Sequence, residues 1–271
     1  MPHRRPPPAP GFSPSRLRYL LGALLGAWLL AGCAHEASGV EGRSVQFDQV
    51  DFHVVDIDLH RHPLTLHWRD PASGTAFASI DTLKRWGERH GQRLLFAANA
   101  GIYGTNGAPL GLYVEHGHAL VPLNTAHGNP RSGNFSLLPN GVFAIDAAGH
   151  ASVRTTAAFD AAGAHPQWAT QSGPMLVIDG ALNPQFLADS DSVKWRSGVC
   201  APSPDHVVFA ISEAPVNFHT FARLFRDRLG CRDALYLDGT ISQLYVDGDY
   251  FGPPAFVVKP YAGMFAVFED R

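Results

Sequence analysis

Apolar and polar side chains alternate through much of the chain after residue 44, and this two-residue period is typical of β-strands with one buried face. The clearest case is residues 45–60, VQFDQVDFHVVDIDLH, whose apolar side chains recur at Val45, Phe47, Phe52, Val54, Ile57 and Leu59. Residues 62–68, HPLTLHW, continue the pattern, and we expect them to return along the preceding strand as a hairpin. The domain is therefore predicted to begin with sheet.

Short apolar runs separated by turn residues predict further strands along the rest of the chain. The first is a buried strand that starts at residue 93, before a loop rich in Gly and Asn. Hairpin turns are expected at residues 116–117, 139–141 and 148–149, and a strand follows the Ser-Gly-Pro turn of residues 172–174. Later apolar runs predict strands at residues 207–212, 234–237, 243–246, 255–258 and 263–268.

Only two segments show the apolar spacing of amphipathic helices, residues 79–91 and residues 217–230. Ser79 or Asp81 can cap the first helix, and Asn217 can cap the second. Many strands with few helices predict an α+β fold, in which strand-rich mixed sheets carry a few flanking helices. A chain of this length can bury a substantial core, and we expect a single compact domain of the catalytic type.

The first 32 residues differ from the rest. Four arginines and no acid precede an apolar run, YLLGALLGAWLLAGC, which is too short to span a bilayer and has the order of a secretory signal. The ending LLAGC resembles the lipobox of bacterial lipoproteins, in which the cysteine is lipidated. We expect a signal peptide over residues 1–32, a lipid anchor at Cys33 with a polar tether through residue 44, and one domain over residues 45–271. An ordinary signal peptide with an incidental cysteine is the alternative.

Location and charge restrict the partners. Ala34 follows the cysteine where an Asp would signal inner-membrane retention in such lipoproteins, so the resemblance favours the outer membrane, facing the periplasm. Removal of residues 1–32 leaves 21 − 4 = 17 basic residues against 24 acids, a net charge of −7, which argues against nucleic acid or an anionic membrane surface as partner. Cys200 and Cys231 remain as an even pair in an oxidising compartment, as a disulfide or as two buried thiols.

Four loops place glycine beside a polar side chain at the end of an apolar strand. They read NAGIY at residues 99–103, QSGP at 171–174, RSGV at 196–199 and LDGTIS at 237–242. Glycine allows the backbone to turn sharply or a ligand to approach closely. Each loop alone is typical of a plain turn, so they carry weight only as a set.

As an ordered set, these loops resemble the phosphodiester glycosidase family, which includes the enzyme that uncovers mannose 6-phosphate on lysosomal proteins by removing N-acetylglucosamine. The resemblance covers residues 94–268 and is nearest to a bacterial subgroup of envelope proteins. The family's Leu-Asp-Gly-Gly-Gly-Ser-Ser stands here as LDGTISQ, residues 237–243. Thr240 and Ile241 therefore replace two glycines, and the bulkier loop keeps one aligned serine, Ser242.

The resemblance implies an envelope hydrolase that cleaves a sugar 1-phosphodiester in a surface or cell-wall glycoconjugate, with a carbohydrate or sugar-phosphate polymer as partner. Phosphate leaves readily, so the site needs groups that hold phosphate and sugar and a carboxylate that activates water or supports the oxocarbenium-like centre. We expect Arg196 to hold phosphate, Asp238 to act as base or nucleophile, and Asn99 to position the substrate. The expected substrate-binding residues are Gly101, Tyr103, Ser172, Gly173, Gly239 and Ser242.

Other interpretations stay open. The altered Asp-Gly-Thr-Ile loop also fits a non-catalytic carbohydrate or exopolysaccharide-binding lipoprotein of the same fold, and a phosphodiesterase or amidase acting on cell-wall fragments is a third candidate. Ser172 lacks the Gly-x-Ser-x-Gly elbow of a hydrolase nucleophile. No metal or cofactor is expected, because the His pairs at residues 60/62 and 116/118 lack nearby acids or cysteines at ligand spacing. A structural Ca²⁺ at residues 247–249 is a minor alternative.

Overall fold

The computed structural model describes residues 1, 3, 40, 42–126, 130–254 and 260–271. The compact unit that carries the fold spans residues 39–271. Most of the predicted signal peptide (residues 2 and 4–32), Cys33, residues 34–39 and 41 of the tether, and the strand predicted at residues 255–258 lie outside the described residues. Strand β1 begins at Gly42, and Val40 is already buried, so the domain starts earlier than the predicted residue 45. Within the described part of the chain, no helix has the length and apolar content needed to cross a membrane.

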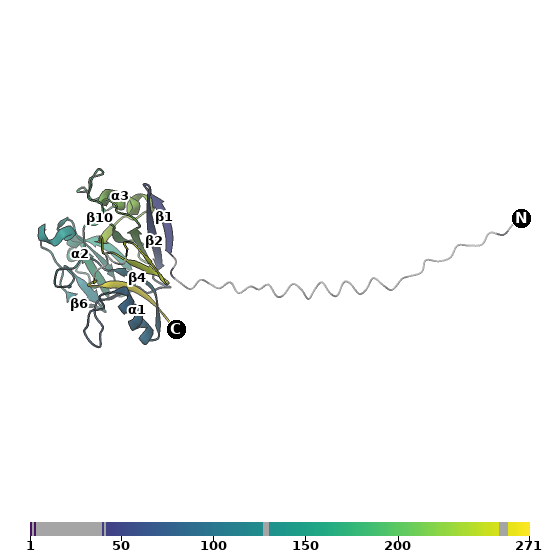
Figure 1. The fold of residues 1–271 in the computed structure, drawn as a ribbon, viewed down its shortest axis with the longest axis horizontal. Coiled ribbons are helices and arrows are strands. Elements are labelled where there is room, and N and C mark those ends of the chain that lie inside the picture. The colour runs from purple at the N-terminus through teal and green to yellow at the C-terminus, as the bar shows by residue number, and fades with distance from the viewer. Residues whose placement is uncertain (2, 4–39, 41, 127–129, 255–259) are drawn as a thin grey trace. The chain divides into compact units, whose positions relative to one another are not determined.

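A seven-stranded sheet forms the largest layer (Figure 1). Its order is β1 (Gly42–Phe47), β2 (Val50–Asp58), β13 (His206–Ser212), β12 (Ser197–Ser203), β14 (Ala234–Asp238), β10 (Met175–Ile178) and β11 (Ala181–Leu182). The interior strand β14, between β12 and β10, is buried from Ala234 to Leu237. Its carboxyl end delivers Asp238 to the rim of the sheet.

Two five-stranded sheets complete the unit. The first has the order β16 (Asp249–Phe251), β15 (Leu244–Val246), β4 (Gln92–Asn99), β17 (Met264–Asp270) and β3 (Thr65–His67). The second has the order β6 (His118–Val121), β5 (Tyr113–Glu115), β9 (Trp168–Ser172), β7 (Gly141–Ile145) and β8 (Ala151–Thr155).

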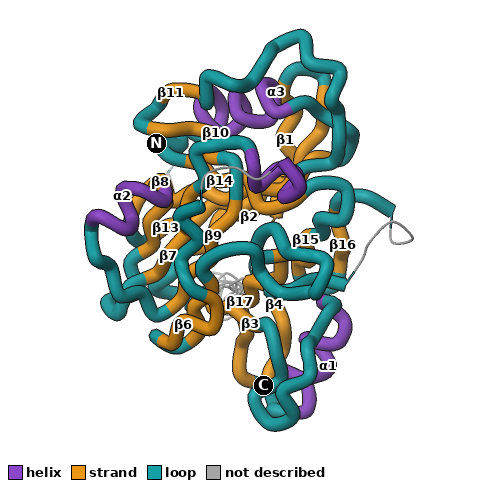
Figure 2. Tube along the Cα trace, turned by 90° about the vertical axis from the view of Figure 1, so that its left-hand side faces the viewer, coloured by secondary structure: helices purple, strands orange, loops and turns teal. Residues whose placement is uncertain are grey.

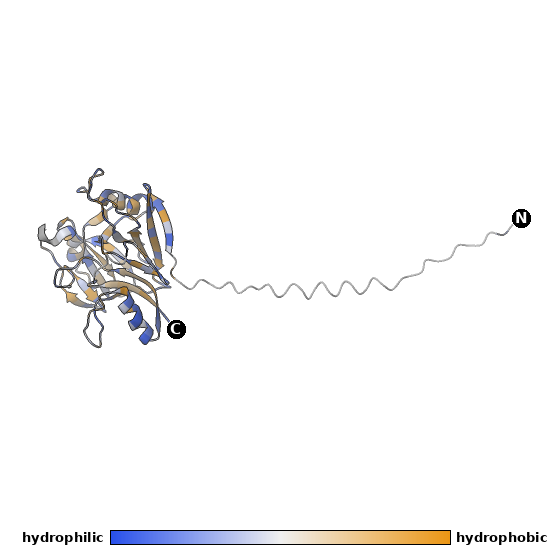
Figure 3. Ribbon diagram, viewed as in Figure 1, coloured by the Kyte–Doolittle hydropathy of each residue, from blue (hydrophilic) through white to orange (hydrophobic). Residues whose placement is uncertain are grey.

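The helices are short and lie outside the sheets. They are α1 (Ile80–Arg89), α2 (Thr156–Ala161) and α3 (Phe218–Arg223), which continues as a π-helical turn at Leu224–Arg228, and a 3₁₀ segment covers Pro130–Ser136. The side chains of Ser79 and Asn217 accept hydrogen bonds from the first turns of α1 and α3, as predicted. Figures 1 and 2 place α1 and α3 at opposite ends of the unit. Figure 3 shows α1 as largely hydrophilic, beside strands that carry the apolar colour.

The core lies where the three sheets meet. Phe265 of β17 packs edge-to-face against Phe143 of β7, with ring centroids 5.2 Å apart, and against Phe209 of β13, at 5.0 Å. Phe96 of β4 contacts Phe209 at 4.8 Å. Each sheet thus contributes at least one buried ring to a shared aromatic cluster, and truncation of such a ring typically costs about 3–5 kcal/mol.

The predicted α+β class is confirmed: the unit is strand-rich, with few helices. Mixed sheets, with parallel and antiparallel pairs, were expected. Every strand pair in the described part of the chain is antiparallel. The hairpin turns at residues 116–117 and 148–149 are confirmed.

Two predicted hairpins are wrong. Residues 65–67 form β3, but they pair with β17 and not with the preceding strand. The segment before residue 139 forms the 3₁₀ helix, so β7 has no strand partner on that side and pairs with β8 and β9. Helix α2 was not predicted, because six residues are too few to show a helical period.

Candidate functional site

The loops that begin at Gln171, Arg196 and Leu237 meet at the carboxyl end of β14. The loop that begins at Asn99 is linked to them by the Asn99 side chain at the end of β4. Ser197, at the start of β12, lies opposite Asp238 in the sheet register. The Ser172 hydroxyl, at the end of β9, donates to the Leu237 carbonyl at 3.0 Å. Asn99 ends β4, and its side-chain oxygen accepts from the backbone N–H of Gln243 at 3.3 Å. Segments that lie far apart in the sequence therefore converge around Asp238.

Asp238 lies on the wall of a cavity of about 350 Å³. The cavity is lined by Tyr103, Gly104, Thr105, Asn134, Lys194, Asp238, Gly239, Thr240 and Ile241. The backbone N–H of Gly239 donates to the Asp238 carboxylate at 2.6 Å. Among these lining residues, Asp238 is the only acid and Lys194 the only cation.

The electrostatics of Asp238 differ from those of a surface acid. Burial raises the pKa of its carboxyl group to about 7, and the hydrogen bond from Gly239 offsets this rise only in part. Burial and then the Asp238 charge raise the pKa of Tyr103 to about 12, and the same two causes raise the pKa values of Tyr236 and Tyr261. Asp238 thus lies among tyrosine hydroxyls, which can donate hydrogen bonds to it or to a ligand beside it.

Arg196 lies behind this wall and is only 1% exposed. Its Nε donates to the Val216 carbonyl at 2.8 Å and one terminal nitrogen donates to the Ser192 carbonyl at 3.0 Å. Its guanidinium carbon sits 3.5 Å from the centre of the Phe218 ring, and burial lowers its pKa. The sequence predicts that Arg196 holds phosphate directly. In the structure Arg196 does not line the cavity, so it has no direct access to a phosphate there.

Arg196 reaches the cavity through Tyr236. The guanidinium lies 5.6 Å from the Tyr236 ring, and its charge opposes the rise in the pKa of the Tyr236 hydroxyl. That hydroxyl accepts from the side-chain amide of Asn134 at 3.1 Å, and Asn134 lines the cavity. Tyr236 therefore lies between the Arg196 charge and the cavity wall, and Arg196 acts on the hydrogen bond between Tyr236 and Asn134.

Asn99 and Ser242 form a buried polar group beneath the cavity. Ser242 is fully buried, and its hydroxyl lies 2.8 Å from the Ser197 hydroxyl. Asn99 is 1% exposed; its Oδ1 accepts from Ser197 at 3.5 Å. Its Nδ2 has no partner among the described residues. These side chains hold the ends of β4, β12 and the loop after β14 together.

Ser172, Gly101 and Gly173 also support the site from below. Gly101 has a φ of +106°, and an added Cβ would lie 3.1 Å from the Ser172 Cβ. A Cβ on Gly173 would lie 2.0 Å from the side-chain oxygen of Asn140. Of the six residues expected to bind substrate, Tyr103 and Gly239 line the cavity, and the other four are buried against its supporting elements.

The sequence pattern did not indicate six residues of the site: Gly104, Thr105, Asn134, Lys194, Tyr236 and Tyr261. A signal existed for Tyr236, which stands two residues before Asp238 on a strand and therefore shares its face. Lys194 stands two residues before Arg196, so a second cation beside the Arg-Ser-Gly loop was the available signal. Asn134 lies in an irregular segment, where no periodic signal exists.

Among the residues that the structure describes, no three or more His, Cys, Asp or Glu side chains form a group that could hold a metal ion. At the minor Ca²⁺ candidate, Asp247 lies in the turn between β15 and β16 and pairs with Arg93 at 2.6 Å.

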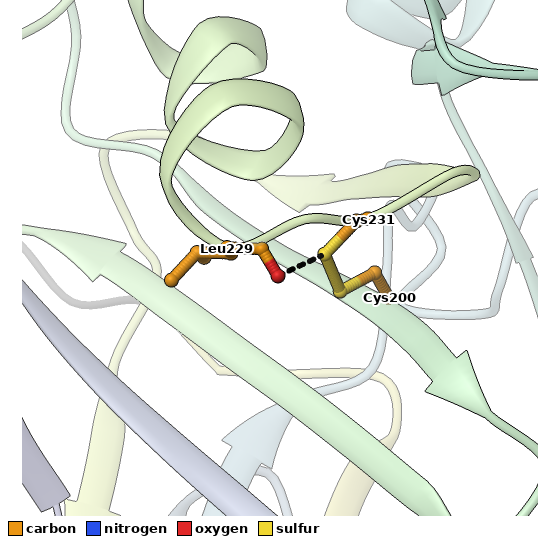
Figure 4. Close-up of a disulfide and its surroundings, with 3 residues drawn as sticks. All are labelled: Cys200, Leu229 and Cys231. Atoms are coloured by element: carbon orange, nitrogen blue, oxygen red, sulfur yellow. Dashed lines mark hydrogen bonds between the residues drawn. A yellow bond between two sulfur atoms is a disulfide. The ribbon is translucent and has the colours of Figure 1, made fainter.

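The structure joins Cys200 and Cys231 by a disulfide, with Cα atoms 6.1 Å apart (Figure 4). This bond ties β12 to the segment between α3 and β14, on the strand pair that carries Ser197 and Asp238.

Comparison with known proteins identifies the family. The family model described as phosphodiester glycosidase matches residues 92–268, from β4 to β17. The uncharacterized protein YigE of Escherichia coli K12 is 38% identical over 183 residues, which cover 68% of this chain and 69% of YigE.

Solved structures share the fold at low identity. The catalytic domain of zebrafish N-acetylglucosamine-1-phosphodiester alpha-N-acetylglucosaminidase, auto-inhibited by its pro-peptide, superposes with a TM-score of 0.58 at 14% identity and covers 86% of this chain and 83% of that one. A hypothetical protein from Synechocystis superposes with a TM-score of 0.54 at 15% identity; 84% of this chain is covered, but only 61% of that chain, less than two thirds.

The family match includes all four glycine-containing loops and the strand that ends at Asp238. It supports a glycosidase-type function that acts on a carbohydrate. The chain belongs to the phosphodiester glycosidase family.

Proposed function

We propose that this protein is an envelope lipoprotein that hydrolyses a sugar 1-phosphodiester in a surface or cell-wall glycoconjugate. The observation that carries the proposal is the cavity whose described lining residues include one acid, Asp238, and one cation, Lys194. A carboxylate whose pKa is near 7 and a cation in one cavity suit a substrate that joins a reactive carbon to an anion.

The chemistry needs little more than these groups. In the proposed step, Asp238 takes a proton from water, the water oxygen bonds to C1 of the sugar, and the C1–O bond breaks with its electron pair leaving on the phosphate monoester. Direct attack of the carboxylate on C1 is the alternative, followed by hydrolysis of the glycosyl-enzyme. Because the departing phosphate is a weak base, no second carboxylate is needed as a general acid.

Lys194 is the proposed phosphate ligand. Its charge compensates the phosphate before and after the bond breaks, and Thr105 and Asn134 line the same cavity and can donate further hydrogen bonds. Arg196 is a positioning residue in this proposal, because it reaches the cavity only through Tyr236 and Asn134. Asn99 and Ser242 hold the strand ends that present Asp238.

The proposed location follows from the sequence features of the amino-terminal region. A lipid anchor at Cys33 would hold the domain at the outer membrane, facing the periplasm. The disulfide between Cys200 and Cys231 supports an oxidising compartment, where such bonds persist. Labelling with palmitate, compared between the wild type and Cys33→Ser, tests the anchor: the label should be lost in the variant.

Turnover of a chromogenic N-acetylglucosamine 1-phosphodiester and of UDP-N-acetylglucosamine tests the activity. Wild type should release the sugar, and Asp238→Ala should lower kcat by at least about a hundredfold, as expected for loss of a catalytic base. Circular dichroism of both proteins controls for folding. No turnover above the Asp238→Ala level across a panel of sugar phosphodiesters would refute the proposal, and sugar binding without turnover would then favour the non-catalytic carbohydrate-binding lipoprotein.

A further inference from the structure

The loop between β11 and β12, residues 183–196, brings Lys194 to the cavity and also exposes two large apolar side chains. Leu187 is 65% exposed and Val193 is 51% exposed. Apart from Met1 at the chain start, no large apolar side chain of the described residues is more exposed than these two. A single exposed apolar residue is ordinary, but two on one loop beside a ligand cavity indicate a surface that meets another apolar group.

Polar groups anchor this loop, so its exposed side chains have a defined position. The Asn217 side-chain amide, at the cap of α3, donates to the carbonyls of Ala188, at 3.1 Å, and Ser190, at 3.2 Å. The buried Arg196 guanidinium donates to the Ser192 carbonyl at 3.0 Å. A surface that is already ordered loses little conformational entropy when a ligand covers it.

The loop packs one apolar side chain against α3 and leaves the next one uncovered. Phe186 stacks on Phe218 of α3, with ring centroids 4.9 Å apart. The Ser190 N–H donates to the Leu187 carbonyl at 3.3 Å, so the chain turns directly after Leu187. The exposure of Leu187 is therefore a property of a folded and packed loop.

Lys194 connects the apolar pair to the cavity. It directly follows Val193, and its backbone N–H and carbonyl are bonded to Val216 at 3.1 Å and 2.8 Å. A phosphodiester carries two alcohols, and in the proposed function one of them, the sugar, lies at Asp238 and the phosphate at Lys194. A cavity of about 350 Å³ is near the lower limit of small-molecule sites, so the second alcohol extends out of it, past Lys194 and toward the exposed loop.

The composition of the loop selects among possible second alcohols. Asp189 and Asp191 are exposed between the two apolar residues, so they disfavour an alcohol that carries another anion. The side chains of Leu187 and Val193 form no hydrogen bonds, and covering them with apolar surface is favourable. An uncharged aliphatic chain satisfies both conditions.

We propose that the loop of residues 183–196 binds the aliphatic chain of a lipid alcohol that is esterified to the phosphate of the substrate, with the chain lying against Leu187 and Val193. This inference rests on the proposed function. It narrows the substrate class to lipid-linked sugar 1-phosphates, in preference to diesters in which the phosphate joins two sugars.

Kinetics on matched substrates test the inference with the full chain. N-acetylglucosamine 1-phosphate is esterified with methanol, with n-octanol or with the 6-hydroxyl of methyl glucoside, and kcat/KM is measured below the critical micelle concentration of the octyl ester. Wild type should prefer the octyl ester to the methyl ester by at least about tenfold, since each methylene that becomes buried is worth about fourfold. Leu187→Ser/Val193→Ser should bring this ratio to within about twofold of unity.

Leu120→Ser is the matched control, because Leu120 is also exposed but lies on β6, in another sheet. It should keep the wild-type ratio. Equal octyl-to-methyl ratios for wild type and for the Leu187/Val193 double variant would overturn the inference. A preference of wild type for the glucoside ester over the octyl ester would also overturn it and would identify a second sugar as the natural alcohol.

A binding experiment separates this inference from the proposed function. The octyl ester is titrated into Asp238→Asn and into Asp238→Asn/Leu187→Ser/Val193→Ser, and saturation-transfer NMR monitors the terminal methyl group of the octyl chain. Binding should be at least about tenfold weaker in the triple variant, with loss of saturation at that methyl group. Loop-dependent binding without turnover of any diester would refute the proposed activity and support the lipid-binding loop, whereas binding that is equal in the two variants would overturn the inference.

Discussion

Replacement of Asp238 by Asn should remove a fall in stability that the wild-type protein shows as the pH rises from about 4 to about 7. Burial raises the pKa of this carboxyl group from 3.8 to about 7 in the folded protein. Between these values the folded state keeps the proton and the unfolded state has lost it. Because the folded state then binds more protons, the free energy of unfolding decreases with rising pH, and above about pH 7 the loss is complete.

The magnitude follows from the two pKa values. One pKa unit corresponds to about 1.4 kcal/mol, so the interval from 3.8 to about 7 corresponds to at most about 4.5 kcal/mol. Asp238 is half-buried and faces a cavity that water can enter, which lowers the cost of its charge. We therefore expect a loss of about 2–4 kcal/mol, a large part of the stability of an ordinary domain.

The assay is urea unfolding at intervals of half a pH unit from pH 4 to pH 8.5. The wild-type free energy of unfolding minus that of Asp238→Asn, taken at each pH, cancels the titration of the other groups. This difference should fall by about 2–4 kcal/mol and then level off near pH 7. A flat difference curve for Asp238→Asn would show that the carboxyl group is not desolvated and would refute the reasoning.

Four further outcomes follow from the same geometry. The kcat/KM of the proposed hydrolysis should rise with pH and reach half its maximum near pH 7, because the base or nucleophile is the ionised form of Asp238; a decrease over this range would instead identify a general acid. Lys194→Ala should lower kcat/KM on a sugar phosphodiester by an amount that corresponds to about 1.5–3 kcal/mol of lost transition-state stabilisation, and Lys194→Arg should recover part of it. An unchanged kcat/KM would remove Lys194 from the site. Cys200→Ser/Cys231→Ser should lose about 2–4 kcal/mol of stability in chemical denaturation, since the disulfide closes a loop across a sequence separation of 31, and reductant should destabilise only the wild type. Gly101→Ala should lower the melting temperature, because φ is +106° and the new methyl group meets Ser172, whereas Gly149→Ala, also at positive φ but in open space, should cost less.

The local pattern predicted strands well and their partners poorly. The alternation in residues 65–67 is correct for a strand, but the partner of β3 is β17, about 200 residues later in the chain. Alternation states only that one face is buried; it holds no information about which distant strand covers the neighbouring edge. The turns at residues 116–117 and 148–149 could be predicted because the partner strands are adjacent in sequence.

The same limit applies to the site. Glycine beside a polar side chain at a strand end identified the segments that converge, and Asp238 lies on the cavity wall. The sequence could not reveal that Arg196 is buried, because this depends on carbonyls at Ser192 and Val216 and on the Phe218 ring, which come from a loop and from the start of α3. The sequence predicted that a basic side chain near residue 196 would face the site. Only the packing of these segments decides which of the two, Lys194 or Arg196, reaches the cavity.

The loop after Asp238 suggests, under the proposed function, a way for specificity to change without loss of the carboxylate. The Ser242 N–H donates to the Gly239 carbonyl at 2.8 Å, and the Ser242 hydroxyl is held against Ser197, so both ends of the turn are fixed. The two residues between Gly239 and Ser242, Thr240 and Ile241, line the cavity, and the sequence resemblance matches them to two glycines. Their side chains fill space that glycine would leave open, while the anchors keep Asp238 in place. In the proposed function, a change at Thr240 or Ile241 should therefore alter which sugar or phosphate ester fits and leave the proposed catalytic group, Asp238, unchanged.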